Sequence, residues 1–211
     1  MKKALLIGLG VVLGAAALLY PFREPIKQAL YALTTADMFV AQDNDDFDPG
    51  PATGSRFPGL RATYQGRDIT LLDEFAGPNG TVLVALRSLD WCPYCMRQLV
   101  QLQASADTFA EAGIGLVAIS YDEPRLQQDF IDRFAITLPV LSDSDALSFK
   151  TLGILNKDYQ RGDTRYGIPY PGMIVIDRDG VVVGKLFIEA YSSRVDSRAA
   201  LVFARQALAL D

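Results

Sequence analysis

Continuous hydrophobic runs alternate with stretches of helical periodicity over the greater part of the chain. Residues 81–86 and 115–120 are apolar almost throughout, a pattern typical of strands that are buried on both faces of a sheet. Between them, residues 93–112 carry apolar side chains three and four positions apart, which predicts a helix. Another helix is expected to begin at Pro124, because proline favours the first helical turn. Together these segments predict a β-α-β unit followed by a helix.

Shorter segments of the same kind lie on both sides of this unit. Residues 62–71 contain two short β-prone segments on either side of Gln65-Gly66-Arg67, which predicts a small hairpin. Downstream we expect a strand at 138–141, a helix at 145–152, a hairpin with strands 173–176 and 181–188, and a closing helix at 196–210. The whole set predicts one α/β domain over residues 52–211, with a mixed central sheet flanked by helices on both faces.

The N-terminal residues have a different pattern. Lys2 and Lys3 precede an uncharged apolar run from Ala4 to Tyr20. At about 1.5 Å per residue, this run is at the short limit for a helix that spans a bilayer. Residues 1–21 therefore predict a signal anchor that is retained as a transmembrane helix. The alternative is a cleaved signal peptide with its cleavage site at the small residues 15–17.

Both interpretations give the same topology. The two lysines favour a cytoplasmic N-terminus, so the rest of the chain is expected on the far side of the membrane. We therefore expect a single-pass protein of the cell inner membrane, whose folded domain lies in an oxidising periplasm. Residues 22–51 are expected to form a stalk and an acidic linker, with a helix at 25–40.

Composition excludes several kinds of site. The chain of 211 residues has a formal net charge of −5, so a nucleic-acid partner is not expected. It contains no histidine, which excludes Ser-His-Asp catalysis, Cys-His catalysis and histidine-ligated metals. Its two cysteines are three positions apart, too few for a cysteine-ligated zinc and too close for a stabilising cross-link. We expect neither a metal nor any other cofactor.

Redox chemistry is the remaining use of the cysteine pair. Cys92 falls where the strand at 81–86 passes into the next helix, and Pro93 suits the first helical position, so Cys92 is the expected N-cap. Unpaired backbone N–H groups and the helix dipole favour a thiolate there, and we expect an exposed, nucleophilic Cys92 with a lowered pKa. Cys95 lies one turn later on the apolar side of the helix and is expected to be the buried resolving thiol.

The segment Trp91-Cys92-Pro93-Tyr94-Cys95 resembles the active-site motif of the thioredoxin superfamily. Its longer context, over residues 52–211, resembles the redoxin branch, which includes the AhpC/TSA family and the TlpA-like membrane-anchored reductases. The resemblance implies a thioredoxin-like fold and thiol–disulfide exchange with protein substrates. It also implies a separate redox partner that supplies or removes electrons. Trp91, Pro93 and Tyr94 would border the substrate, with Tyr94 exposed.

The resemblance further implies a cis-proline opposite the cysteine pair. Pro171 stands just before the predicted C-terminal hairpin, at the position expected for this proline, and Pro169 is the other candidate. In the cis form, the backbone of Tyr170 would pair with a bound substrate chain. The sequence departs from thioredoxin at Leu86, where thioredoxin has a buried carboxylate, and it lacks the glycine pair that glutaredoxins use to bind glutathione.

Three functions remain open. The favoured one is a thiol–disulfide oxidoreductase that acts on exported proteins, either as a reductase or as an oxidant. The second is a thiol peroxidase of the AhpC/TSA type, whose Pro-x-x-x-Thr-x-x-Cys pattern is absent before either cysteine; for Cys95, Ser88 and Cys92 fill those two places. The third is a chaperone or assembly module that binds through the groove around Trp91 and Pro171 without turnover.

Overall fold

The computed structural model describes residues 20–41 and 46–210. It divides into two compact units, residues 1–37 and residues 38–211, which we treat separately. Most of the expected signal anchor at residues 1–21 lies outside the described residues. Within the described ranges, no helix is both long enough and apolar enough to cross a membrane.

The described part of the first unit is a 3₁₀ turn, η1 (Tyr20–Phe22), and one helix, α2 (Arg23–Thr34). Ile26, Leu30 and Leu33 are all more than half exposed on this helix. The prediction that the helix continues to residue 40 is wrong. The hydroxyl of Thr35 donates to the carbonyl of Tyr31 at 2.7 Å, and this local bond competes with a further helical turn.

The second unit is built on a mixed sheet, as predicted. In the described part of the chain it has seven strands, in the order β3-β2-β6-β5-β4-β7-β8. They are β3 (Arg67–Ile69), β2 (Ala62–Tyr64), β6 (Val140–Ser142), β5 (Ile114–Ser120), β4 (Gly80–Leu86), β7 (Gly172–Asp177) and β8 (Val182–Phe187). The three central strands β6, β5 and β4 are parallel, and the outer pairs are antiparallel. Both predicted hairpins, β2–β3 and β7–β8, are present.

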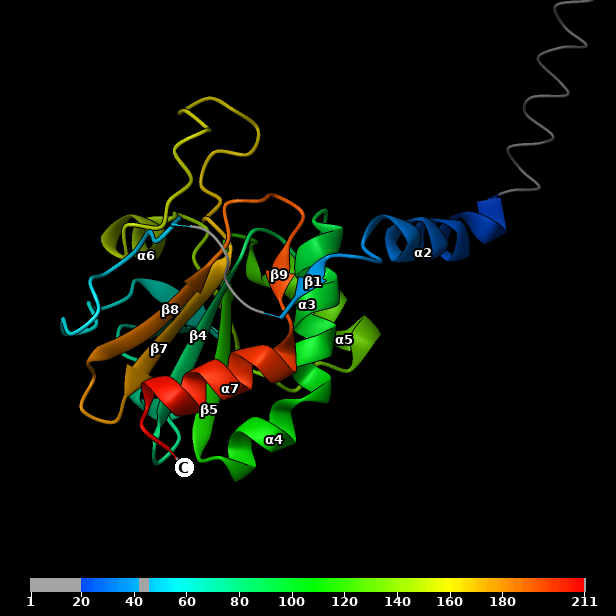
Figure 1. Cartoon of the computed structure of the whole chain (residues 1–211). Helices are drawn as coiled ribbons and strands as arrows, with labels where there is room; N and C mark the ends of the chain where they lie inside the picture. The colour runs from blue at the N-terminus through cyan, green and yellow to red at the C-terminus, as the bar shows by residue number, and fades with distance from the viewer. Residues whose placement is uncertain (1–19, 42–45, 211) are drawn as a thin grey trace, which may run out of the picture. The chain divides into compact units, whose positions relative to one another are not determined.

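Helices cover both faces of this sheet (Figure 1). One face carries α3 (Pro93–Ala104), α4 (Ala106–Glu111), α5 (Pro124–Phe134) and α7 (Ser197–Ala207), and the other carries α6 (Leu147–Thr151) and the 3₁₀ turn η2 (Asp73–Phe75). Strand β4 supplies both cores by alternation. Val82, Val84 and Leu86 pack with the first helix group, whereas Leu83 and Ala85 pack with the second.

The helix predicted over residues 93–112 is broken at Ser105. Its hydroxyl bonds to the carbonyl of Gln101 at 3.2 Å and to the hydroxyl of Ser197 at 2.8 Å. A side chain that returns to the preceding turn weakens helix continuity, so α3 ends and α4 begins there. The bond to Ser197 also ties this break to the start of α7.

A second, two-stranded sheet joins segments far apart in the sequence. Strand β1 (Phe39–Val40) runs parallel to β9 (Arg194–Val195), with Phe39 opposite Arg194 and Val40 opposite Val195. Residues 39 and 40 fall in the segment that the sequence assigned to a stalk and linker, yet they take part in this sheet. The pairing fixes the strand that carries Arg194, which belongs to the site described next.

Candidate active site

Cys92 and Cys95 lie at the N-terminus of α3, directly after the loop that follows β4. Cys92 is the N-cap, as predicted, with Pro93 at the first helical position. Its sulfur accepts the backbone N–H of Cys95 at 3.4 Å. The two sulfurs are 2.8 Å apart and share a hydrogen bond, so both thiols occupy one site.

Both cysteines are completely buried, each with 0% of its surface exposed. The expectation of an exposed Cys92 is therefore wrong. The neighbouring aromatic residues Trp91 and Tyr94 pack against the core cluster that contains Cys92, and each is held by a second ring. The indole N–H of Trp91 donates to the hydroxyl of Tyr121 at 3.0 Å, and the ring of Tyr94 packs edge-on against Tyr191 at 5.8 Å. Tyr94 is half-buried rather than exposed. A substrate sulfur can reach Cys92 only after a side chain moves.

Two arginines surround the sulfur of Cys95. The backbone N–H of Arg87, in the first position after β4, donates to Cys95 Sγ at 3.3 Å. The guanidinium of Arg194, on β9, donates from Nη2 to the same sulfur at 3.7 Å. Each arginine is only 2% exposed. Arg87 is close to the motif in the sequence but was assigned no role there. Arg194 was not anticipated, because it reaches the site only through the fold.

The turn at Tyr191 holds the two guanidiniums in place. Its carbonyl accepts from Arg87 Nη2 at 2.8 Å and from Arg194 Nη1 at 3.2 Å. Its ring lies over the Arg87 guanidinium at 3.7 Å, in cation–π geometry. Neither arginine forms an ion pair with a carboxylate in the described part of the chain, and Arg87 Nε, Arg87 Nη1 and Arg194 Nε have no hydrogen-bond partner. Two buried positive charges thus lie beside Cys95 without an acidic partner.

These charges determine which cysteine is ionised. Burial alone would raise the pKa of Cys95, but the hydrogen bond from Cys92 and the positive charges of Arg194 and Arg87 outweigh it and hold this pKa well below its usual range. The hydrogen bond to Cys95, together with burial, raises the pKa of Cys92. The surroundings therefore favour the thiolate on Cys95 and the proton on Cys92. The predicted order was the reverse, because the helix N-terminus was visible in the sequence and the arginines were not.

A buried carboxylate anchors the loop between β4 and α3. Asp122, just beyond β5, accepts from the hydroxyl of Ser88, the backbone N–H of Leu89 and the hydroxyl of Ser120, each at 2.7 Å. Burial raises the pKa of Asp122. Leu86 stands where thioredoxin has its buried carboxylate, and Asp122 was not identified from the sequence. Its position at the carboxyl end of the neighbouring parallel strand was the signal that could have revealed it.

Trp91 is enclosed by residues from two other segments. Tyr121 holds its indole N–H, and the guanidinium of Arg165 lies over its ring at 4.5 Å. Arg165 belongs to the long connection between α6 and β7, which places that connection next to the motif. Trp91 is half-buried and borders the cysteine pair, in agreement with its expected place, whereas Arg165 was not anticipated.

Tyr170 and Pro171 do not take the expected form. No peptide bond between described residues is cis, so the bonds before Pro169 and Pro171 are both trans, the ordinary state for proline. The backbone N–H of Tyr170 donates to Ile154 at 2.7 Å, and its ring packs against Phe47 in the second hydrophobic core. The N–H of Tyr170 is therefore already paired, and its ring packs against the core that does not contain the two cysteines. Pro171 borders a cavity of about 10 Å³ that is also lined by Gln98 and Arg194.

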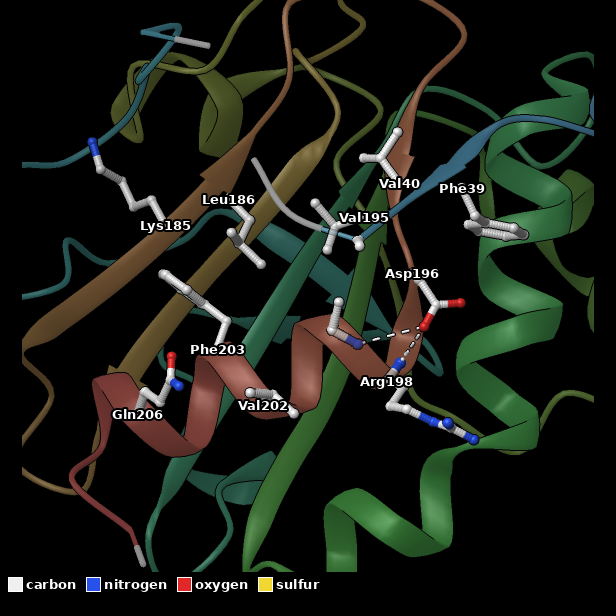
Figure 2. A pocket seen from close by; sticks show the side chains of 12 residues that line it. Phe39, Val40, Lys185, Leu186, Val195, Asp196, Arg198, Val202, Phe203 and Gln206 are labelled. Carbon is white, nitrogen blue, oxygen red and sulfur yellow. Dashed lines mark hydrogen bonds between the residues drawn. The ribbon is translucent and has the colours of Figure 1, made fainter. Parts of the chain in front are cut away.

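A larger hollow lies elsewhere on the second unit. It has a volume of about 760 Å³ and lies between β1, β8 and α7, where Val40, Leu186 and Phe203 form its apolar wall (Figure 2). Neither cysteine lines it, so it is separate from the redox pair. In the described ranges no group of three or more histidine, cysteine, aspartate or glutamate side chains is placed to hold a metal ion.

Comparison with known proteins gives relatives of two kinds. A "Putative peroxiredoxin" of Mycobacterium tuberculosis is 31% identical over 91 residues, which is 43% of this chain and 57% of that protein. The thiol-disulfide oxidoreductase ResA of Halalkalibacterium halodurans is 28% identical over 95 residues, which is 44% of this chain and 46% of ResA. The chain thus matches only about half the length of these curated relatives.

Solved structures show the same fold. Reduced Prx3 of Vibrio vulnificus superposes with a TM-score of 0.61 at 21% identity, over 74% of this chain and 99% of that one. The peroxidoxin BcpB of Mycobacterium tuberculosis superposes with a TM-score of 0.56 at 23% identity, over 77% and 96%. The AhpC/TSA family matches residues 53–185, a segment that includes Arg87 and both cysteines but ends before Arg194. This match spans more than half of the chain, and the protein is a member of the AhpC/TSA family of thioredoxin-like redox proteins.

Proposed function

We propose that this protein is a thiol–disulfide oxidoreductase whose Cys92 and Cys95 alternate between a dithiol and a disulfide. One observation carries the proposal: the two sulfurs are 2.8 Å apart and share a hydrogen bond. The hydrogen bond from Cys92 and the positive charges of Arg194 and Arg87 lower the pKa of Cys95 and so favour a thiolate there. A thiolate next to a second sulfur is the arrangement from which a disulfide forms and breaks by exchange. The similarity to ResA supports the same chemistry.

The geometry suggests a role for each sulfur. A substrate sulfur bonds to Cys92, which lies at the N-cap and next to Trp91. The Cys95 thiolate then attacks Cys92 Sγ, the Cys92–Cys95 disulfide forms, and the substrate leaves as a thiolate. Before that, the shared proton passes from Cys92 to Cys95, and Cys92 attacks the substrate disulfide as a thiolate. The first substrate sulfur leaves and takes this proton from Cys95, which is again a thiolate for the second step. All steps are reversible, and the direction depends on the relative potentials.

We further propose that the substrates are exported proteins and that the chain is tethered to the inner membrane. Support comes from the sequence, where two lysines precede an apolar run of the length of a short membrane span. A separate redox partner, membrane-bound or exported, would restore the starting state of the pair after each turnover.

Two single substitutions test the exchange mechanism. Cys95→Ser removes the resolving sulfur and is expected to trap a mixed disulfide between Cys92 and one half of a peptide disulfide, whose other half leaves as a thiol; the adduct is visible as an added mass that dithiothreitol removes. Cys92→Ser is expected to give no such adduct and no turnover. The proposal is wrong if wild-type protein forms no intramolecular disulfide in an oxidised glutathione buffer. A Cys92→Ser, Cys95→Ser double variant with full activity in the cell would instead support a binding module.

A thiol peroxidase is the second candidate. The family match, the peroxiredoxin relatives and the Cys95 thiolate between two arginines favour it. In that reaction the Cys95 thiolate attacks one peroxide oxygen and becomes a sulfenic acid, while the other oxygen leaves and takes a proton to form water or an alcohol. The thiol of Cys92 then condenses with the sulfenic acid, which forms the disulfide and releases water. Ser88 and Cys92 occupy the places of the proline and threonine in the peroxidase motif, which counts against this activity. Fast, saturable oxidation by hydrogen peroxide, followed through the single tryptophan, Trp91, would establish it.

A further inference from the structure

The charges around Cys95 differ between the two redox states. In the dithiol state, one thiolate lies beside the guanidiniums of Arg87 and Arg194. In the disulfide state that negative charge is gone, and two buried positive charges remain without an acidic partner in the described part of the chain. Burying an unpaired charge is costly, and an opposite charge nearby relieves part of that cost. The reduced state therefore gains a stabilising interaction that the oxidised state lacks.

The other polar groups of the site do not cancel this difference. Asp122 is occupied by three donors from Ser88, Leu89 and Ser120, and no bond joins it to either arginine. Asp122 keeps these three donors in both states. Burial raises the pKa of Asp122 more than the charge of Cys95 does, and the charges that act most on Cys95 are those of Arg194 and Arg87. The carbonyl of Tyr191 is a neutral acceptor, which orients the guanidiniums without neutralising them.

We propose that the protein acts as a disulfide donor, because Arg87 and Arg194 stabilise the reduced Cys92–Cys95 pair and so make its disulfide strongly oxidising. This inference rests on the proposed function. The substrates of the protein would be polypeptides with two free cysteines that can approach each other. A disulfide is a stronger oxidant when its reduced form is stabilised more than its oxidised form.

The same arrangement fixes the sulfur that a substrate attacks. A substrate thiolate attacks Cys92 Sγ, and the bond from Cys92 to Cys95 breaks. Cys95 leaves as a thiolate, which is stabilised by the hydrogen bonds from Arg194 and from the backbone N–H of Arg87. A thiol of lower pKa leaves faster, so attack at Cys92 is the productive one. The second substrate thiol, as its thiolate, then displaces Cys92 and forms the substrate disulfide. In balance, one protein disulfide and one substrate dithiol give one substrate disulfide, Cys92 as a thiol, Cys95 as a thiolate and one proton.

The test compares equilibrium constants with glutathione. The full-length chain, kept in mild detergent, is equilibrated with mixtures of reduced and oxidised glutathione, quenched in acid, and alkylated to count free thiols. Thioredoxin is measured beside it. The chain's dithiol is expected to be at least about a thousandfold harder to oxidise than that of thioredoxin, the lower limit of the factor by which disulfide donors differ from this reductase.

Arginine variants show whether the charges cause this difference. Arg194→Gln is expected to ease oxidation by about ten- to hundredfold, the effect of one charge at 3.7 Å from a thiolate. Arg87→Gln keeps the backbone N–H bond to Cys95 and removes only the charge, so it is expected to ease oxidation in the same direction. Arg194→Lys, which keeps the charge, is expected to retain most of the wild-type constant. Arg178→Gln is the matched control, because it removes the same charge from the exposed β7–β8 turn.

Proton uptake gives a readout that a structural role would not move. At pH 7 the wild-type disulfide is expected to take up one proton when it is reduced, because Cys95 stays ionised. The disulfide of the Arg194→Gln variant is expected to take up more than one proton when it is reduced, a number that approaches two. If Arg194→Gln does not fold, Arg87→Gln is read in the same way.

The outcomes separate this inference from the proposed function. If no Cys92–Cys95 disulfide forms, the proposed function itself fails. If the disulfide forms with a constant equal to or more reducing than that of thioredoxin, the donor assignment is overturned. It is also overturned if the two glutamine variants shift the constant no more than Arg178→Gln does.

Discussion

The turn at Tyr191 provides the sharpest prediction about access to the buried sulfurs. Tyr191→Ala removes the ring that lies over Arg87 at 3.7 Å and packs edge-on against Tyr94 at 5.8 Å, but it leaves the carbonyl that holds both arginines. A partly exposed cation–π contact contributes about 0.5–1 kcal/mol and an aromatic pair about 0.5–1.5 kcal/mol. The closed state should therefore lose about 1–2.5 kcal/mol relative to the open state.

This change is measurable as the alkylation rate of the native, reduced protein. When opening is fast and precedes reaction, the rate follows the population of the open state. A loss of 1–2.5 kcal/mol then predicts an increase of about 5- to 70-fold, since 1.36 kcal/mol is a factor of ten. Iodoacetamide consumption by mass spectrometry gives the rate, and the same reaction in denaturant gives the unprotected limit.

A matched substitution guards against general destabilisation. Tyr64→Ala removes another edge-on aromatic pair, with Phe75 at 5.3 Å, in the β2–β3 hairpin away from the motif. It is expected to leave the alkylation rate near the wild-type value. Equal rates in Tyr191→Ala and wild type would show that the Tyr191 turn does not cover the cysteines. Equal increases in both variants would show that global unfolding, and not local opening, exposes them.

Three further predictions concern charge and packing. Because the pKa of Cys95 is lowered in the folded protein, its ionisation adds stability that is fully present above its unfolded pKa of about 8.5 and is lost as pH falls through the folded pKa. The free energy of unfolding of the reduced wild type should therefore exceed that of Cys95→Ala by an amount that grows with pH below about 8.5. Urea titrations at several pH values measure this difference. Asp122→Asn places an amide donor among three donors and should destabilise by about 1–3 kcal/mol, whereas Asp129→Asn, at an exposed position on α5, should change stability by less than about 0.5 kcal/mol. Gly172→Ala would put a Cβ 2.2 Å from the ring of Phe187 and should lower the free energy of unfolding by about 1–3 kcal/mol. Adding Phe187→Leu to this variant should restore part of the lost stability. A Gly172→Ala variant as stable as the wild type in urea would contradict the crowding.

Local patterns predicted most of the fold. The apolar runs at β4 and β5 marked the buried strands, and Pro93 and Pro124 marked helix starts that the structure confirms. Ser105 broke the long helix through bonds to Gln101 and Ser197, the second of which is 92 residues away. A contact at that separation leaves no periodic trace in the sequence.

The site also combines features that local sequence predicts with features that only the fold creates. Cys92 as N-cap follows from its neighbours alone, and the structure confirms it. Which sulfur carries the charge depends on Arg194, which is 99 residues from Cys95, and on the way β9 is placed. The helix dipole was a sound argument for Cys92, but two buried guanidiniums next to Cys95 outweigh a single helix terminus.

The pairing of β1 with β9 bears on how this protein should be shortened for study. A fragment that begins at the predicted domain boundary, residue 52, or at the first residue of the family match, residue 53, would keep the whole central sheet and both cysteines but lose Phe39 and Val40. The backbone N–H of Arg194 would then lose its acceptor, the carbonyl of Met38, at 2.8 Å. Such a fragment would have a different reduction potential of the Cys92–Cys95 pair even if it folds, because Arg194 would lie on a strand that has lost its partner β1. Truncations intended for redox measurements should start upstream of Met38.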